Sequence, residues 1–287
     1  MASTDPAVLR YAAFTADPAG GNPAGVVLDA TGLDDAAMQA IATEVDYAET
    51  AFLVGVDPDG ARVIRYFSPI AEVPFCGHAT IATAVALAER DGPGTIRFRT
   101  PVGEVSIGTT ADASGASAAF TSVEPVVVPL PDADLDRVLA LLGLGLDDLD
   151  EAHPPRLAAA GSPHPVLVLR DAAAFDGFTF DPAEARALMD ERGWPATIAV
   201  FRKVDADDAG GRYEARNVFP VGRITEDPAT GSAAAAFGGY LRALGLVDPP
   251  ARVVIAQGRH VGRPGELVVD VPAAGGVVVT GRAVPIG

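Results

Sequence analysis

Cysteine is almost missing from this chain. The 287 residues contain one cysteine, Cys76. A single thiol cannot form an intramolecular disulfide, and it cannot supply the several thiolates of a structural zinc site. Domains held together by internal disulfides and zinc sites built from several thiolates are therefore excluded.

Basic residues are also scarce. Lysine and arginine together number 21 against 38 aspartates and glutamates, which gives a formal net charge of -17 at pH 7. Such a chain repels the phosphate backbone of nucleic acids and the surface of anionic membranes. We therefore expect neither a nucleic acid nor a membrane among its partners.

The sequence contains neither a long hydrophobic run nor a secretory signal. Residues 1–6 contain no basic segment followed by an apolar run, which a secretory signal requires. The longest uncharged apolar runs are two alanine-rich stretches, and both are too short to cross a bilayer. The sequence predicts a soluble cytoplasmic protein.

These two alanine-rich stretches are organised alike. A polar turn, Cys76-Gly77-His78, precedes the uncharged residues 79–88, and Thr230-Gly231-Ser232 precedes the uncharged residues 233–241. Each stretch predicts a buried helix, because a surface helix would show a polar stripe. Similar segments precede both stretches in the same order: 21–28 and 161–169, then 65–69 and 216–220. The chain is therefore predicted to contain two copies of one unit.

Strand patterns surround both predicted helices. Alternation predicts strands at 8–14, 24–28, 62–67, 95–100, 103–108, 118–121, 165–170, 197–201, 212–219, 252–257, 266–271 and 277–284. The chain does not alternate strand and helix in the way that makes an open parallel sheet, so each half is predicted to be mostly antiparallel strands around one apolar helix, an α+β fold. Hydrophobic residues make up 49% of the chain, enough for two cores.

Residues 124–131 contain three prolines and are predicted to form a stiff, extended linker. The predicted domains are therefore residues 1–124 and residues 132–287. The last strand is a candidate to pair with the N-terminal domain.

Polar residues at the start of each apolar helix are the first candidates for chemistry. Free N–H groups and the positive end of the helix dipole favour an anion there. Cys76 and His78 stand at the first start, and Asp227, Thr230 and Ser232 stand at the second. Two like domains form a natural cleft, which we expect these residues to line. Exposed helix capping explains the acidic residues and Ser232 at least as well, and packing explains Cys76 and His78, so these alternatives stay open.

Glu49 is a candidate general base. It precedes the apolar residues 51–54, so a strand there would hold its carboxylate beside buried side chains. Desolvation raises the pKa of such a carboxyl group, as a general base near neutral pH requires. The pattern alone favours the alternative, a solvent-exposed glutamate at a strand edge.

Other polar residues are weaker candidates. His164 occupies the repeat position that matches Ala24 and is a candidate to line the cleft. Arg259 and Arg263 lie in a predicted tight hairpin and are candidates to contact a carboxylate, whereas His153 is expected on the surface. The histidines do not have the spacing of metal ligands, and the chain lacks a phosphate-binding glycine loop with lysine and a G-x-S-x-G motif.

Five motifs together resemble the PhzF-like family of phenazine-biosynthesis proteins. They are Gly20–Val26, Ala48–Phe52, Phe75–Thr80, Glu226–Ala233, and Gln257-Gly258 with Gly262–Pro264. The resemblance covers essentially the whole chain and is far more specific than any single motif.

The resemblance implies the diaminopimelate epimerase-like fold, with two pseudo-symmetric domains, each an antiparallel barrel-like sheet around a central helix, and the active site between them. It implies an isomerase of the trans-2,3-dihydro-3-hydroxyanthranilate type in secondary-metabolite biosynthesis. Such an isomerase needs neither a metal nor an organic cofactor, acts on a small carboxylated substrate and is a homodimer.

The resemblance also implies roles for individual residues. Glu49 would be the acid/base that moves the proton, while His78, Asp227 and Ser232 would bind and polarise the substrate and help relay the proton. The substrate-binding residues would be Asn22, Cys76, Gly77, Ala79, Thr230 and Gly231.

Amino-acid epimerases of the same fold use one thiol at each helix start. Here the two positions are Cys76 and Thr230, and a threonine hydroxyl is far too weak an acid for that role. We therefore expect one-base proton transfer by Glu49. Two alternatives stay open: an amino-acid epimerase or racemase on the same fold, and a non-catalytic protein that binds small acids.

Overall fold

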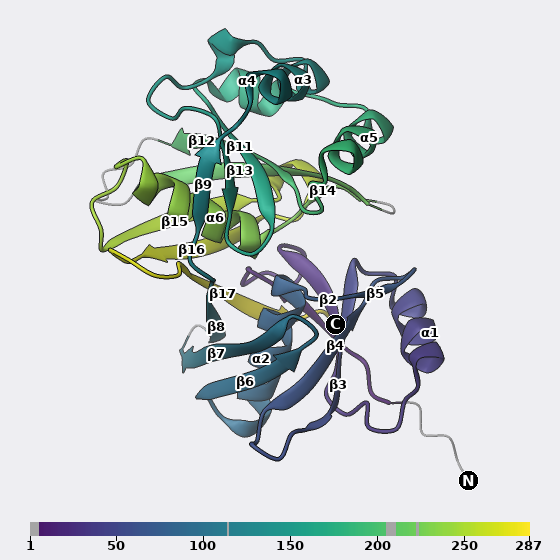
Figure 1. Cartoon of the computed structure of the whole chain (residues 1–287). Helices are drawn as coiled ribbons and strands as arrows, with labels where there is room; N and C mark the ends of the chain where they lie inside the picture. Colours follow the sequence, from purple (N-terminus) through teal and green to yellow (C-terminus); the bar gives the residue numbers. More distant parts are fainter. Residues whose placement is uncertain (1–5, 114, 205–210, 222–223) are drawn as a thin grey trace. The chain divides into compact units, whose positions relative to one another are not determined.

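The computed structural model describes residues 6–113, 115–204, 211–221 and 224–287 (Figure 1). The chain divides into two compact units. Unit 1 comprises Met1–Phe120 and Thr280–Gly287, and unit 2 comprises Thr121–Val279.

Unit 1 is built around helix α2 (Gly77–Asp91), which contacts strands β1, β2, β3 and β7 (Figure 1). Every residue from His78 to Ala88 in α2 is buried, as the uncharged sequence predicts. The amphipathic helix α1 (Asp35–Val45) lies outside the sheet and buries Met38, Ala42 and Val45. The strands are β1 (Leu9–Ala13), β2 (Asn22–Val27), β3 (Glu49–Val56), β4 (Arg62–Phe67), β5 (Glu72–Val73), β6 (Thr95–Thr100), β7 (Gly103–Asp112) and β8 (Gly115–Thr121).

Unit 2 repeats this plan around helix α6 (Gly231–Ala243), whose residues Ala233–Leu241 are all buried. The further helices are α3 (Asp132–Leu142), α4 (Ala172–Gly177) and α5 (Pro182–Arg192), with short 3-10 turns η1 (Leu146–Asp148) and η2 (Arg259–Val261). The strands are β9 (Val126–Pro129), β10 (Arg156–Ala159), β11 (Pro163–Leu169), β12 (Ile198–Val204), β13 (Arg212–Val221), β14 (Ile224–Asp227), β15 (Ala251–Gln257) and β16 (Gly265–Val271), and β17 (Val278–Pro285) continues into unit 1.

The strand pairings of the two units follow the same order. In unit 1, β1 and β2 are antiparallel, β2 and β3 parallel, β3 and β4 antiparallel, β4 and β6 parallel, and β6 and β7 antiparallel. In unit 2, the same sequence of directions links β10, β11, β12, β13, β15 and β16. The internal repeat read from the sequence is therefore a repeat of topology.

The strands are mostly antiparallel, as predicted, but the antiparallel barrel-like sheets that the resemblance implies also contain parallel pairs. Among the described residues each unit has two such pairs, and in each pair a helix lies between the two strands along the chain; in unit 1 these helices are α1, between β2 and β3, and α2, between β4 and β6. A crossover through a helix returns the chain in the same direction, so the second strand pairs in parallel. Both sheets are therefore mixed.

Part of the predicted linker at residues 124–131 is a strand of unit 2. Val126–Pro129 forms strand β9, which pairs with β10 in antiparallel register. The valines favour a strand, and the only proline inside it is Pro129 at its last position, where a missing N–H costs little. At the other end of the chain, Ala283–Pro285 of β17 pairs with β1.

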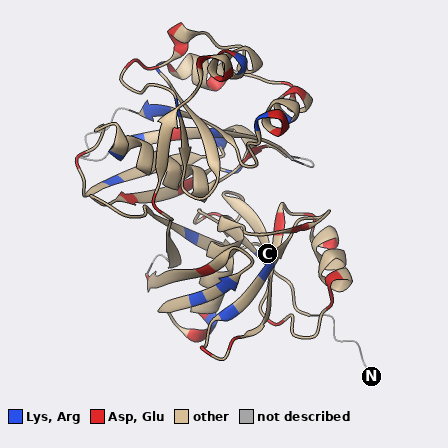
Figure 2. Ribbon diagram, viewed as in Figure 1, with Lys and Arg blue, Asp and Glu red and all other residues tan. Residues whose placement is uncertain are grey.

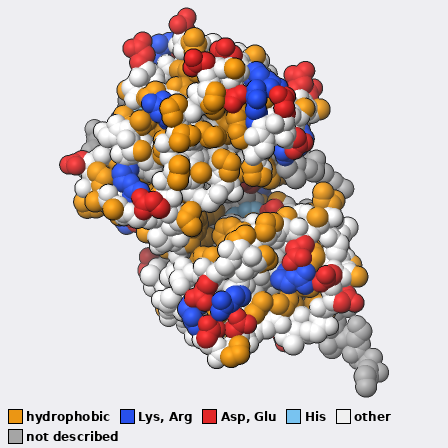
Figure 3. All heavy atoms as spheres, in the orientation of Figure 1, with side chains coloured by type: hydrophobic (Ala, Val, Ile, Leu, Met, Phe, Trp, Pro, Cys, Tyr) orange, Lys and Arg blue, Asp and Glu red, His pale blue; other side chains and the backbone are white. Residues whose placement is uncertain are grey.

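Lys, Arg, Asp and Glu residues occur along the helices and strands of both units (Figure 2). Arg137 of α3 forms an ion pair with Glu191 of α5 at 2.7 Å between Nη1 and Oε1. Hydrophobic side chains are spread over the visible face of unit 2 (Figure 3), and the exposed valines Val126 and Val128 belong to β9.

Among the described residues, no helix has both the length and the apolar character needed to cross a membrane.

Two adjacent glycines in α6 allow neighbouring strands and loops to approach this helix closely. A Cβ atom on Gly239 would lie 2.3 Å from Cβ of Pro125, the residue before β9. Alanine normally stabilises a helix by about 1 kcal/mol relative to glycine, so glycine here is explained by the contact and not by helix propensity.

We therefore expect Gly239→Ala to lower the free energy of unfolding by about 1–3 kcal/mol, because overpacking outweighs the gain in helix propensity. Gly177→Ala at the end of α4 is the matched control, since its Cβ would meet no atom within 4 Å. Urea unfolding of the full chain measures both. A Gly239→Ala protein as stable as the wild type would contradict this account of the packing.

Candidate functional site

Helices α2 and α6 both begin without a side-chain cap. Their N-cap residues are Cys76 and Thr230. In contrast, Asp34 caps α1 by accepting a hydrogen bond from the Ala37 N–H at 2.8 Å, and Asp181 caps α5. The first N–H groups of a helix have no partner within the helix. The uncapped starts of α2 and α6 therefore each present N–H donors and a positive dipole end suited to an anion.

Three of the predicted site residues meet at the start of α2. Glu49 is the first residue of β3, Cys76 precedes α2 and His78 lies in its first turn. Glu49 Oε2 lies 3.5 Å from Cys76 Sγ and 3.4 Å from His78 Nε2, and Cys76 Sγ lies 3.4 Å from His78 Nδ1. The side chains of Glu49 and His78 are 16% and 8% exposed. Glu49 is therefore not the solvent-exposed strand-edge residue that the pattern alone favoured.

The imidazole of His78 is neutral near pH 7. Burial lowers the pKa of His78 to about 4, while a hydrogen bond with the backbone of Pro23 acts in the opposite direction. Because proline has no N–H, the Pro23 group must be the carbonyl, which accepts from a ring N–H. The other ring nitrogen then carries a lone pair that can accept a proton.

The remaining residues predicted to bind substrate in unit 1 are Asn22, Gly77 and Ala79. Asn22 begins β2 and is fully buried, and Ala79 is also fully buried. Gly77 is the first residue of α2 and is partly exposed. Gly77 and Ala79 can therefore offer their backbone N–H groups at the helix start.

At the start of α6, Asp227, Thr230 and Gln257 form a buried network. The Thr230 hydroxyl donates to Asp227 Oδ2 at 2.6 Å. Gln257 Nε2 donates to the Asp227 carbonyl at 2.7 Å, and Gln257 Oε1 accepts from the Thr230 N–H at 3.2 Å. Ser232 in the first turn is partly exposed, while Gly231 is buried. Gln257 thus holds the segment that carries Asp227 and Thr230.

The alternative of exposed capping acids is wrong for Glu226 and Asp227, which are 8% and 9% exposed. They belong to strand β14, where successive side chains point to opposite faces. Glu226 forms a buried ion pair with Arg216, whose Nη1 also donates to the carbonyls of Phe175 and Phe178. Glu226 therefore has a structural role. Asp227 points to the opposite face of β14, toward Thr230 at the start of α6.

The strand register shows which residues of the two units are equivalent. In unit 1, Val73 pairs with Tyr66 and lies three residues before the N-cap of α2. In unit 2, Asp227 pairs with Asn217 and lies three residues before the N-cap of α6. The equivalent pairs are Glu49 and Thr197, Tyr66 and Asn217, Val73 and Asp227, Cys76 and Thr230, and His78 and Ser232. The scaffold is repeated, but the chemistry at its two helix starts differs.

Sequence reasoning named His164 as a weak candidate but missed the buried polar residues Thr197 and Asn217 of unit 2. His164 Nδ1 lies 2.9 Å from Thr197 Oγ1, while His164 Nε2 and both amide atoms of Asn217 have no hydrogen-bond partner among the residues that the structure describes. His164 and Asn217 are fully or almost fully buried. Aligning the repeats by strand position would have marked Thr197 and Asn217, because they match Glu49 and Tyr66.

The remaining weak candidates lie elsewhere. Arg259 forms ion pairs with Asp176 at 2.7 Å and Glu214 at 3.2 Å on the surface. The backbone N–H of Arg263 donates to the Gly258 carbonyl at 3.0 Å in the turn after η2. His153 is 4% exposed, so its expected surface position is wrong.

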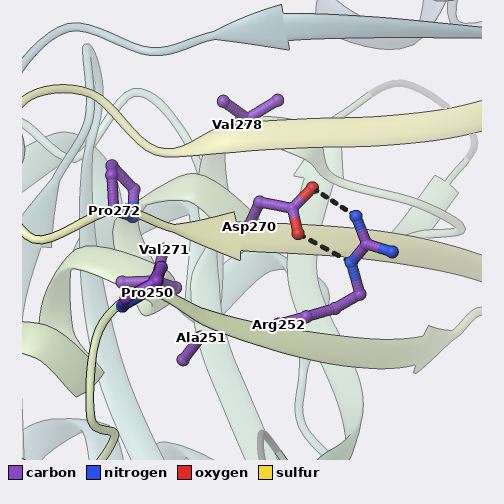
Figure 4. Close-up of a pocket in the computed structure, with 7 residues that line it drawn as sticks. All are labelled: Pro250, Ala251, Arg252, Asp270, Val271, Pro272 and Val278. Carbon is purple, nitrogen blue, oxygen red and sulfur yellow. Dashed lines mark hydrogen bonds and ion pairs between the residues drawn. The ribbon is translucent and has the colours of Figure 1, made fainter.

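A surface pocket of unit 2 carries no residue of the predicted site (Figure 4). Its polar lining is the ion pair between Arg252 and Asp270, at 2.7 Å between Nε and Oδ1. The rest of the lining is apolar, including Pro250 and Pro272. An exposed, self-neutralised ion pair offers no group for acid/base chemistry.

Comparison with known proteins decides the family. The family model described as "PhzC-PhzF: Phenazine biosynthesis-like protein" matches residues 11–287. The chain belongs to this family. The resemblance read from the five motifs is thus confirmed.

Curated relatives of this PhzF-family chain are named as isomerases. An uncharacterized isomerase from Mesorhizobium japonicum is 32% identical, over 96% of this chain and 93% of the relative. A trans-2,3-dihydro-3-hydroxyanthranilate isomerase from Pseudomonas chlororaphis is 30% identical, over 88% of this chain and 85% of the relative. The prediction of a PhzF-family isomerase is confirmed at this level.

Solved structures support the fold. A PhzF-family phenazine biosynthesis protein from Bacillus anthracis has a TM-score of 0.85 at 24% identity and covers 98% of this chain and 96% of that chain. A hydroxyproline epimerase from Agrobacterium vitis has a TM-score of 0.63 at 15% identity and covers 98% of this chain and 90% of that chain. The fold is therefore shared with epimerases, as the resemblance implied.

The buried His164 should make the PhzF-family chain sensitive to acid. Burial lowers the pKa of His164 to about 4, and a backbone hydrogen bond with Thr197 opposes this shift. Between pH 6.5 and about 4 the unfolded chain binds a proton that the folded chain does not, so stability falls as the pH falls through this range. The loss from His164 is about 3 kcal/mol, and His78 contributes in the same direction.

We expect His164→Gln to reduce the difference in unfolding free energy between pH 7 and about pH 4. Chemical unfolding at both pH values gives this difference for the variant and the wild type. The slope with pH is the measure, because the variant also loses a buried hydrogen bond at every pH. An unchanged slope would mean that His164 is not buried as a neutral imidazole.

Proposed function

We propose that this protein is a cofactor-independent isomerase that moves a proton between two carbons of a small carboxylated substrate. The observation that carries the proposal is the placement of the Glu49 carboxylate, partly buried and next to His78, at the uncapped start of α2. A base held in place and a positive helix end are what proton removal from carbon requires.

The reaction begins with binding of the substrate carboxylate. The free N–H groups at the helix starts are the donors that suit it. Glu49 then takes a proton from a carbon that is activated by conjugation, and the electron pair left behind delocalises into a dienolate-like anion. Hydrogen bonds and the helix dipole stabilise this developing charge.

His78 gives the proton a second acceptor. The protonated Glu49 can donate to the neutral ring of His78, since the Nε2 to Oε2 distance is 3.4 Å. The proton then returns to a different carbon of the same anion. Atoms and charge balance, and the net result is an allylic shift without a redox partner.

Asp227 and Ser232 complete the proposed machinery. Their assignment to the same substrate follows the family resemblance and remains a proposal. Asp227 accepts from Thr230, and Ser232 lies in the first turn of α6, so both are placed by elements whose position Gln257 supports. We expect these two side chains to bind and polarise the substrate.

The first candidate substrate is trans-2,3-dihydro-3-hydroxyanthranilate, the compound in the name of the Pseudomonas chlororaphis relative. A two-thiol epimerase is disfavoured, because Thr230 occupies the position in α6 that Cys76 occupies in α2. The homodimer, the cytoplasmic location and the independence from a metal remain predictions. Sedimentation velocity would test the first of them.

We expect Glu49→Gln to lower turnover by about 100-fold to 10,000-fold, since the amide cannot accept the proton. Incorporation of solvent deuterium into trans-2,3-dihydro-3-hydroxyanthranilate, and into a panel of carboxylated cyclohexadienes and amino acids, measures the proton transfer. Glu44→Gln on the exposed side of α1 is the matched control and should retain the wild-type rate. A Glu49→Gln protein that retains the wild-type rate would contradict the one-base mechanism.

Exchange only at the α-carbon of amino acids would instead favour the epimerase alternative. Tight binding of a small acid without any exchange would favour a binding protein.

A further inference from the structure

Three side chains that can bind a divalent cation such as zinc lie together at the start of α2. They are a thiol, an imidazole and a carboxylate, from Cys76, His78 and Glu49. One ligand atom from each lies within 4.8 Å of the others, and among the described residues no other group of three or more potential ligands does so. Zinc is bound in proteins by these three ligand types.

The distances between the donor atoms match the geometry that zinc requires. Ordinary zinc–ligand bond lengths and tetrahedral angles place the ligand atoms about 3.3–3.6 Å apart. In this site Cys76 Sγ and Glu49 Oε2 are 3.5 Å apart, and His78 Nε2 and Glu49 Oε2 are 3.4 Å apart. Cys76 Sγ and His78 Nε2 are 3.8 Å apart. The triangle closes around a tetrahedral ion with changes of only a few tenths of an ångström.

The surroundings of the imidazole also suit a metal ligand. A histidine that binds zinc through one ring nitrogen usually donates its other ring N–H to a carbonyl or carboxylate. The Pro23 carbonyl supplies such an acceptor for His78. The imidazole is therefore already fixed in its orientation before a cation arrives.

The helix dipole opposes a cation at this position, because the start of α2 is its positive end. The carboxylate of Glu49 and the thiolate that forms when Cys76 binds the cation offset this effect. Three protein ligands leave a fourth position for water or an anion, which the helix N–H groups favour. This is the arrangement of an open, reversible site rather than a closed structural site.

We propose that Zn²⁺ binds Glu49, Cys76 and His78 and reversibly inhibits the enzyme. The inhibition, but not the binding, rests on the proposed function. A zinc ion on the carboxylate and the imidazole removes the lone pairs that would take and relay the substrate proton. Zinc is thus a competitor for the base and has no role in the reaction.

The repeat provides an internal comparison. The residues equivalent to Glu49, Cys76 and His78 are Thr197, Thr230 and Ser232, three hydroxyl side chains with weak affinity for zinc. The proposal therefore predicts one such site per chain, located in unit 1.

Cobalt is the spectroscopic probe for this site. We expect Co²⁺, titrated into metal-free full-length protein without a polyhistidine tag, to give a thiolate-to-cobalt charge-transfer band that saturates at one ion per chain. Added Zn²⁺ should remove the band by displacement. Cys76→Ala should abolish it, and Glu49→Gln and His78→Gln should weaken cobalt binding by at least about tenfold.

The matched control is His260→Gln, which removes a partly buried imidazole beside Asp176, in unit 2, and should leave the band unchanged. A wild-type protein without the band, or a Cys76→Ala protein that retains it, overturns the site whatever the enzymatic activity is. The cobalt titration therefore tests the metal site even if no substrate of the enzyme is found.

The second arm uses solvent-deuterium exchange once a substrate is known. Zn²⁺ should lower the wild-type and His260→Gln rates, and EDTA should restore them. In Cys76→Ala the fractional inhibition, relative to its own metal-free rate, should require at least about tenfold more Zn²⁺. Cobalt binding without inhibition by Zn²⁺ would overturn the inhibitory role.

Discussion

The enclosure of two helices, each with a long uncharged stretch, is the constraint on which the rest of the structure depends. Residues 78–88 of α2 and 233–241 of α6 are buried on every side, so each helix must be surrounded by strands rather than placed against one face of a sheet. A helix enclosed in this way can meet a ligand only at its ends. The absence of side-chain caps at both starts leaves N–H groups that a small anion can use.

Repetition of the scaffold did not require repetition of the chemistry. The two units share their pairing directions and the position of the central helix, but the residues at the helix starts differ in acid strength. Unit 1 carries a carboxyl group, a thiol and an imidazole in mutual contact. Unit 2 carries Thr230 linked to Asp227 and supported by Gln257. This difference between the two helix starts is consistent with the proposed proton transfer by a single base.

The sequence predicted the elements that periodicity determines and missed those that depend on partners distant in the chain. The strands at 62–67 and 95–100 were predicted correctly, because alternation is a local signal. Strand β9 was taken for a linker, since its pairing with β10 is not visible in residues 124–131 alone. The burial of Glu226 could not be predicted locally, because its partner Arg216 lies on another strand. The grouping of Glu49, Cys76 and His78 in one site was implied by the family resemblance and not by their spacing.

The course of β17 has a consequence for the order in which the chain folds during synthesis. Unit 2 is continuous from Thr121 to Val279, whereas unit 1 also includes Thr280–Gly287. The Phe14 N–H donates to the Arg282 carbonyl at 2.6 Å, and the Ile286 N–H donates to the Arg10 carbonyl at 2.8 Å. The edge of β1 therefore keeps unpaired backbone groups until residues 280–287 have been synthesised. Unit 1 begins before unit 2 in the chain, but it can complete its sheet only after all of unit 2 has been made.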